Sequence, residues 1–490
     1  MTALLASCNK WLDVKPEAES TKEELFSTEK GFRDALTGAY LDMKNTNTYG
    51  GSLVWGNIEY LAHNWDVATP SDQLHNSLVS GDYNNAAARG ALDATYAGLY
   101  KVIADVNGIL GEIDPKASLF TEDNYALIKG EALGLRAFMH FDALRLFGPM
   151  PDSGSVKPVL AYMKTVSHDI TEPESYDAFC KDILADLTTA ATLMQGVDPV
   201  TKYSMSQLNP TSANSSTTPV IADNFYMHRQ VRMNYYAVLA LTARVYLWMA
   251  AKDPSLKAEA ARYAKMVVDA KDQNGVPTFR LVNENDRVNG DYTMSPEHIM
   301  ALSVYDLDQQ ATDLFGETGS LQRSDFSIEA GYYYLNFLFP VTERTGDVRW
   351  NGMWQYKAAN PSYVRYNKYV QRASNPVQQV PLIRLSELYL ILTETASSKA
   401  EAETYYSAYA AEKGIPFNEG FSQDDYQSDR RSRLIREYAR EFFAEGQSFF
   451  TYKRMDVTTL PAGWTANYFT GSAARYVVPL PDREISYHNK

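Results

Sequence analysis

The chain has 490 residues and carries 46 Lys and Arg side chains against 60 Asp and Glu side chains, a formal net charge of -14 at pH 7. Apolar residues make up 45% of the sequence and charged residues 22%, which allows a large core and excludes a wholly disordered chain. The acidic balance repels phosphate backbones and therefore excludes general nucleic-acid binding.

The first residues contain a short apolar run that ends at Cys8. The tetrapeptide Leu5 to Cys8, which reads Leu-Ala-Ser-Cys, resembles the lipobox of bacterial lipoproteins, where the cysteine is lipidated and becomes the mature N-terminus. A complete secretory signal has a basic segment and about 7–15 apolar residues, more than the residues before Cys8 provide. We interpret residues 1–8 as a truncated lipoprotein signal and expect lipidation at Cys8.

The periodicity of apolar residues predicts a mainly α-helical protein. Between residues 93 and 113, apolar side chains recur every three or four positions from Tyr96 to Ile113, as on one face of an α-helix. Short connections between helices indicate tetratricopeptide-like hairpins packed as an α-α superhelix, although no period of 34 residues is visible. Similar patterns predict helices at 22–43, 122–147, 174–195, 231–250, 256–272, 382–411 and 429–452.

Residues 273–380 lack a sustained helical period and are rich in Gly, Asn, Asp and Tyr. We expect irregular loops and short strands there, carried on the helical scaffold and suited to ligand binding. This predicts an N-terminal helical region at 9–272 and a C-terminal region at 273–490, in which ligand loops at 273–380 precede closing helices at 381–455. The two regions are expected to form one structural unit.

The sequence lacks the motifs that usually mark catalytic or cofactor sites. It contains no Gly-rich phosphate loop, no H-E-x-x-H motif and no G-x-S-x-G motif. His63, Asp66 and His75 are close in sequence, but no further metal ligand is evident, so no metal site is predicted. We expect no cofactor and no enzymatic activity, although a glycosidase pair of carboxylates would leave no sequence motif.

Charged residues at helical spacing within apolar segments are interpreted as buried ion pairs. Arg384 and Glu387 stand three positions apart, and each is predicted to be the partner of the other because a buried charge needs one. Arg433, Glu437 and Arg440 are spaced for two further pairs. We expect these side chains to stabilise the fold.

Taken together, these segments resemble the SusD/RagB family of outer-membrane nutrient-uptake lipoproteins. The resemblance covers almost the whole chain. It rests on several short motifs that occur in the same order as in the family. The matching segments are Cys8 to Asp13, Gly31 to Tyr40, Leu99 to Asn107, Gly130 to Ala132, Phe147 to Pro151, Arg440 to Gly446 and Val478 to Pro481.

The resemblance implies a non-enzymatic receptor on the cell surface, anchored in the outer membrane by lipid on Cys8. Family members cover a SusC-like TonB-dependent transporter and deliver oligosaccharides or, in some branches, peptides to it. We therefore expect glycan capture and delivery to such a transporter. Two alternatives remain open: a peptide-binding receptor of the same family, whose best pocket should lie on the helical surface, and a glycoside hydrolase on a helical scaffold.

The candidate ligand residues come from two loop regions, as the family resemblance implies. Sugars present flat C–H faces and hydroxyl edges, which suit aromatic platforms flanked by hydrogen-bonding side chains. We expect Trp65 to stack on a sugar while its neighbours bind hydroxyl groups; packing in the core is the alternative for Trp65 and Trp350. The candidates are His63, Asn64, Trp65 and Asp66 in the first region, and Tyr292, Phe315, Arg323, Tyr332, Trp350 and Trp354 in the second.

Overall fold

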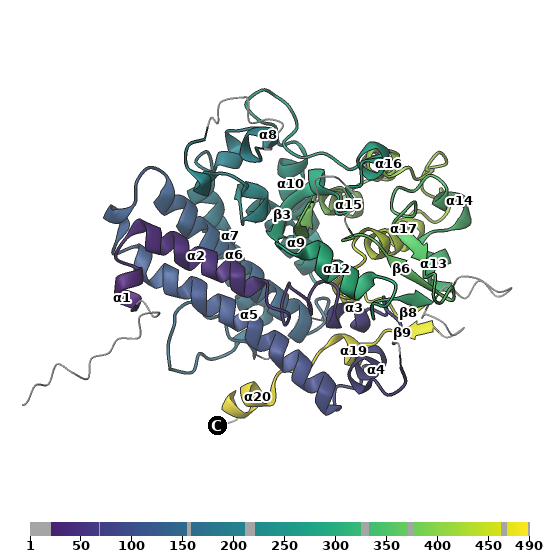
Figure 1. Ribbon diagram of the computed structural model, residues 1–490, viewed down its shortest axis with the longest axis horizontal. Helices are drawn as coiled ribbons and strands as arrows, with labels where there is room; N and C mark the ends of the chain where they lie inside the picture. Colours follow the sequence, from purple (N-terminus) through teal and green to yellow (C-terminus); the bar gives the residue numbers. More distant parts are fainter. Residues whose placement is uncertain are drawn as a thin grey trace, which may run out of the picture.

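A computed structural model of the chain describes residues 21–67, 69–153, 158–210, 221–324, 333–370, 377–461 and 468–488. Cys8 and Tyr332 lie outside these residues. Helices dominate the described chain, and short strands form small sheets of two or three strands (Figure 1). The predicted mainly α class is therefore confirmed.

The N-terminal half is built from helices that pack on one another in sequence order. Helix α6 lies between α5 and α7, and nearly all of its side chains from Gly130 to Phe147 are buried. Figure 1 shows α2, α5 and α6 side by side, as expected for stacked helical hairpins. The helices of this stack are α2 (Glu29–Met43), α5 (Ala86–Ile113), α6 (Asn124–Phe147), α7 (Tyr176–Met194), α9 (Tyr235–Met249) and α10 (Lys257–Val268).

The structure divides two of the predicted helices. The segment expected as one helix at 382–411 contains the end of a strand, then α15 (Leu385–Thr395) and α16 (Lys399–Lys413). Ser398 interrupts the helix because its backbone is extended and its hydroxyl accepts the first-turn amide of Glu401 at 3.2 Å.

The segment expected at 429–452 likewise divides into α17 (Tyr426–Glu441) and α18 (Ser448–Arg454). The turn between them holds Gly446 at a φ of 72°, in the left-handed region. A Cβ atom at Gly446 would lie 1.9 Å from the carbonyl oxygen of Leu53, so close packing against the N-terminal loop requires glycine.

The described residues between 273 and 380 form short helices and strands, with more helix than the sequence indicated. Strand β3 (His298–Ser303) pairs antiparallel with β7 (Gln379–Arg384), and the second sheet has the order β4-β6-β5. The elements of that sheet and the short helices are β4 (Arg323–Ser324), β5 (Trp354–Tyr356), β6 (Tyr363–Tyr366), α11 (Glu284–Val288), α12 (Leu307–Phe315), α13 (Tyr333–Leu338) and α14 (Val341–Arg344).

One hydrophobic core cluster extends from Phe26 to Val478 and joins the N-terminal stack to the closing helices. None of the described helices combines the length and the apolar character needed to cross a bilayer. Apart from short 3-10 turns, the remaining helices and strands are α1 (Lys22–Leu25), α3 (Asn57–Leu61), α4 (Gln73–Ser80), α8 (Met205–Leu208), α19 (Ala473–Tyr476), α20 (Asp482–His488), β1 (Pro158–Leu160), β2 (Glu174–Ser175), β8 (Thr459–Pro461) and β9 (Tyr468–Thr470).

Candidate functional site

The structure places Trp65 in the core. Its side chain is 1% exposed, its Nε1 donates to the carbonyl of Trp55 at 2.8 Å, and its ring packs against Phe315 and Phe443. Phe315 is buried in the same cluster. An indole enclosed on all sides has no free face for a sugar. The expectation of a Trp65 platform is corrected, and the core alternative holds.

Asn64 is also occupied by the protein itself. Its amide donates to the carboxylate of Glu59 and to the hydroxyl of Ser448, the latter at 3.0 Å. Glu59 is fully buried and accepts the backbone N–H of Gly446 at 2.8 Å. Burial raises the pKa of Glu59 to about 7. These bonds join α3 to the turn before α18, so Asn64 has a structural role.

Asp66 and Arg323, which were both predicted as ligand residues, lie close together. Both side chains are buried inside the protein. Their carboxylate and guanidinium lie 3.6 Å apart, and Asp66 also accepts the backbone N–H of Ser324. Arg323 donates to the carbonyl of His63, whose ring contacts Arg475. The two loop regions therefore converge through buried polar contacts instead of an open ligand surface.

Trp350 and Trp354 are half-buried and keep part of their surface accessible. Trp350 packs against Phe339 and beneath the guanidinium of Arg344, which lies 4.5 Å from its ring. Trp354 lies on β5 and packs against Tyr366. These two indoles stay candidates for ligand contact.

Tyr292 is buried, with its hydroxyl beside Gly352. Tyr332 lies outside the described residues, so its place in the predicted set stays untested.

A cavity of about 850 Å³ lies on the helical side of the molecule, between α5, residues 161–171 and α20. We call it the Tyr96 groove, because Tyr96 and Tyr100 stack in its wall with ring centroids 4.5 Å apart. Pockets for small ligands usually have volumes of roughly 300–1,000 Å³. The polar side chains that line the groove are Asp93, His168, Asp169, Thr171, Asp482, Arg483 and Glu484.

Side chains of α5 and α6 hold one wall of the Tyr96 groove in place. The Tyr100 hydroxyl donates to the carbonyl of Ala161 at 3.1 Å, and the Asn107 amide donates to the carbonyl of Met163 at 2.9 Å. The backbone N–H of Met163 donates to Nε2 of His140 at 3.0 Å. The Tyr and Asn of the Leu99 to Asn107 motif therefore position this wall.

The Tyr96 groove is acidic and contains an unsatisfied acceptor. Asp93 Oδ1 is buried without a hydrogen-bond partner, and burial raises the pKa of this carboxyl group. Four carboxylates line the groove against one guanidinium, from Arg483. A neutral hydroxylated ligand or a cationic ligand fits this lining. Periodicity alone does not reveal the groove, because Tyr96 belongs to the apolar stripe of α5 and the other walls come from distant segments.

The predicted buried charges are present, but Arg384 and Glu387 have other partners. Arg384 is fully buried and contacts Glu441 at 2.6 Å and Glu445 at 2.7 Å. Glu387 pairs instead with Arg244 through two hydrogen bonds of 2.6 Å. The predicted Arg384–Glu387 pair is wrong because Arg384 ends a strand, with φ -125° and ψ 155°, so helical spacing does not apply.

In α17, the predicted Glu437–Arg440 pair is confirmed, with Arg440 Nε donating to Glu437 at 3.0 Å. Arg433 pairs with Asp429 instead of Glu437. Burial alone would raise the pKa of Glu437, but Arg440 and Arg349 lower it to about 2. These charges therefore serve the fold, as expected.

A family model for the SusD family matches residues 203–477. The chain belongs to the SusD family. A second family model, described as starch-binding and associating with the outer membrane, matches residues 10–247 of this SusD-family chain. A search of curated proteins gave no match.

Solved structures of SusD-like proteins have the same fold. A SusD superfamily protein from Bacteroides thetaiotaomicron superposes with a TM-score of 0.69 at 18% identity, covering 94% of this chain and 98% of its own. One from Bacteroides fragilis gives a TM-score of 0.68 at 18% identity, with coverages of 95% and 99%. A SusD-like carbohydrate binding protein from Bacteroides vulgatus gives a TM-score of 0.67 at 15% identity, with coverages of 94% and 97%.

Proposed function

We propose that this SusD-family chain is a non-enzymatic cell-surface receptor that captures oligosaccharides and delivers them to a SusC-like TonB-dependent transporter. Lipid on Cys8 would anchor it in the outer membrane. Membership of the family supports the proposal, as does the starch-binding description of the model that matches residues 10–247. The observation that carries the ligand assignment is the Tyr96 groove with its unpartnered Asp93 acceptor.

The chemistry of the groove suits a neutral saccharide. Sugar hydroxyl groups are donors and acceptors, so they can hydrogen-bond the half-buried carboxyl group of Asp93 and the other carboxylates without bringing a charge into an acidic cavity. The half-buried ring of Tyr100, backed by the buried Tyr96, supplies an apolar surface against which the C–H groups of a sugar can pack. Anionic sugars are disfavoured there by the surrounding carboxylates.

Calorimetry against a panel of host and plant oligosaccharides tests this proposal. Loss of a charge-assisted hydrogen bond costs about 1.5–3 kcal/mol, so Asp93→Ala should weaken binding about ten-fold or more. Asp34→Ala, which removes an exposed carboxylate from α2, is the matched control and should leave affinity unchanged. Absence of binding by every saccharide would refute the ligand class.

Trp350 and Trp354 provide the competing location for the same ligand. If Trp350→Ala or Trp354→Ala abolishes saccharide binding while Asp93→Ala does not, the site lies at the β4-β6-β5 sheet instead of the Tyr96 groove. An aromatic anchor commonly contributes 2 kcal/mol or more to binding, so roughly a thirty-fold loss would be expected at the true site.

The second candidate function is a peptide receptor of the same family. The position of the Tyr96 groove on the helical surface favours it, and the acidic lining would accept a basic peptide. Calorimetry with Lys-rich peptides separates the two. Peptide binding that Asp93→Ala weakens, together with no saccharide binding, would establish the peptide receptor.

Separate measurements test the anchor, the partner and the absence of turnover. The full-length precursor should incorporate labelled fatty acid, and Cys8→Ala should abolish the label; equal labelling of the variant would refute the anchor. Affinity purification from outer membranes should recover a TonB-dependent transporter. Oligosaccharides incubated with the protein should stay intact, because release of reducing ends would establish a glycoside hydrolase.

A further inference from the structure

Two adjoining cavities lie among α9, α10, α15, α17 and α18. Neither shares a lining residue with the Tyr96 groove. The outer cavity has a volume of about 380 Å³ and is lined by Lys257, Arg430, Arg431 and Arg454. The inner cavity, of about 30 Å³, is lined by Arg145, Arg244 and Arg454. Because they share Arg454, we treat them as one feature, the basic cleft.

The charge of the basic cleft is opposite to that of the whole chain. Six cationic side chains line it against the carboxylates of Glu387 and Glu394, in a protein of net charge -14. Arg244 pairs with Glu387, Arg454 with Glu394, and Arg145 with Asp142 behind the cleft wall, so the excess charge comes from the outer cavity. Excess positive charge held in a concavity attracts anions from solution.

Three cations of the outer cavity have no carboxylate partner within 4.0 Å in the part of the chain that the structure describes: Lys257, Arg430 and Arg431. Arg430 is 9% exposed and is held by neutral acceptors, the carbonyl of Ala396 at 3.1 Å and the hydroxyl of Tyr426 at 2.7 Å. Arg430 is therefore held in place without being neutralised, and among the described residues Arg431 donates only to the backbone carbonyl of Met455.

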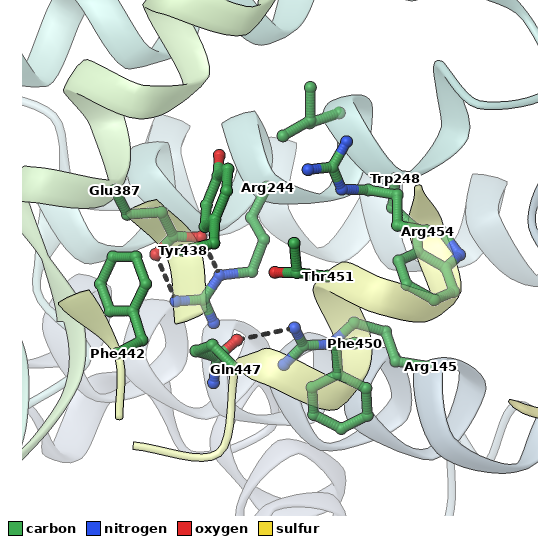
Figure 2. A pocket seen from close by; sticks show the side chains of 11 residues that line it. Arg145, Arg244, Trp248, Glu387, Tyr438, Phe442, Gln447, Phe450, Thr451 and Arg454 are labelled. Carbon is green, nitrogen blue, oxygen red and sulfur yellow. Dashed lines mark hydrogen bonds and ion pairs between the residues drawn. The ribbon is translucent and has the colours of Figure 1, made fainter. Parts of the chain in front are cut away.

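The inner cavity holds donors that lack an acceptor. Arg244 is 5% exposed and Tyr438 is 4% exposed, and neither Arg244 Nη1 nor the Tyr438 hydroxyl has a hydrogen-bond partner. Figure 2 shows the Arg244 guanidinium between Glu387 and Gln447, and Gln447 in turn contacts Arg145. Burial holds the pKa of Arg145 below its ordinary value, and repulsion from Arg244 adds to this effect.

We propose that the basic cleft binds a sulfate or phosphate group, carried by a free ion or by an ester. The outer cavity has the room for such a group, and a doubly charged oxyanion matches its several cations better than a monovalent ion does. Its oxygens can accept hydrogen bonds from Lys257 and Arg431. The outer cavity has apolar walls from Leu247, Ala250 and Pro254, so it has room for the carbon skeleton of an ester.

Calorimetry with sodium sulfate and sodium phosphate, at an ionic strength held constant with chloride, tests the proposal. Both anions should bind saturably to the wild-type protein. The double variant Lys257→Gln, Arg431→Gln should bind each at least about ten-fold more weakly, since a charge-assisted contact is worth about 1.5–3 kcal/mol. Both side chains lie at the opening of the cleft, so circular dichroism and the melting temperature should show an intact fold.

Lys181→Gln is the matched control, because Lys181 is an exposed cation on α7 outside the cleft. It should bind sulfate and phosphate as the wild type does. Equal weakening by Lys181→Gln would show only a general charge effect and overturn the proposal. No saturable binding of either anion would also overturn it and leave ordered water as the occupant of the inner cavity.

Glucose 6-sulfate and glucose 6-phosphate, each compared with glucose, distinguish the source of the group. Tighter binding of an ester than of its free anion assigns an esterified small molecule to the cleft, whereas equal binding assigns the free anion. Neutral oligosaccharides should bind the double variant as they bind the wild type, so failure here is separable from failure at the Tyr96 groove.

Discussion

Arg384 is the most informative position for testing the buried charges. Its guanidinium is fully buried and contacts three carboxylates, Glu441 at 2.6 Å, Glu445 at 2.7 Å and Glu297 at 2.9 Å. Breaking a buried ion pair by removing one partner costs about 3–5 kcal/mol, because the remaining charge is left uncompensated. Arg384→Met removes one cation from three carboxylates at once, although Arg349 still pairs with Glu441, Lys368 with Glu445 and Lys413 with Glu297. We therefore expect a loss in unfolding free energy of about 3–5 kcal/mol at pH 7.

The loss should depend on pH. Burial alone would raise the pKa of Glu441, but Lys413, Arg384 and Arg349 hold it well below its ordinary value. A carboxylate with a depressed folded-state pKa contributes stability above its unfolded pKa, about 4.3, and loses it as the pH falls through the folded value. Without Arg384 that contribution shrinks, and protonation of Glu441 and its neighbouring carboxylates reduces the excess negative charge in the variant. The difference between wild type and variant should therefore narrow toward pH 4.5.

Urea unfolding followed by circular dichroism at pH 7 and pH 4.5 measures both effects. Lys30→Met is the control, because Lys30 pairs with Asp34 on an exposed face of α2 and its loss should leave stability unchanged within error. If the Arg384→Met variant is as stable as the wild type at pH 7, the stabilising role of Arg384 is refuted. An equal loss at both pH values would show that lost packing, and not the excess negative charge of the three carboxylates, causes the loss of stability.

Three further outcomes are expected. Trp65→Ala should lower the unfolding free energy by about 3–5 kcal/mol, as large core truncations do, and a near-neutral effect would place the indole outside the core. The pKa of Glu59 is raised to about 7, so the unfolding free energy of the wild type should fall by about 3 kcal/mol as the pH rises from 4.5 to 7. Glu59→Gln should flatten this pH dependence, and a variant with the same dependence as the wild type would contradict the assignment. Glu387→Ala should melt well below the wild type because it leaves Arg244 unpaired; normal melting together with loss of a glycosidase activity would favour the enzyme alternative.

The sequence alone was sufficient for the fold class and the family. Apolar residues at steps of three and four predicted the helices that became α5, α6 and α7, because the spacing of side chains on a helix is a local property. The same spacing predicted Glu437–Arg440, where both residues lie on one continuous helix. The ordered motifs from Gly31 to Pro481 indicated the SusD/RagB family.

Only the tertiary structure decided which distant groups meet. Arg384 pairs with residues of α17 and the turn after it, because strand β7 carries it there, and no local spacing encodes that choice. Trp65 is enclosed by Phe315 and Phe443, which are hundreds of positions away in sequence. The Tyr96 groove is assembled from α5, residues 161–171 and α20. Local periodicity fixes which face of an element is apolar, but the burial of a given side chain and its partners depend on the segments that fold against that face.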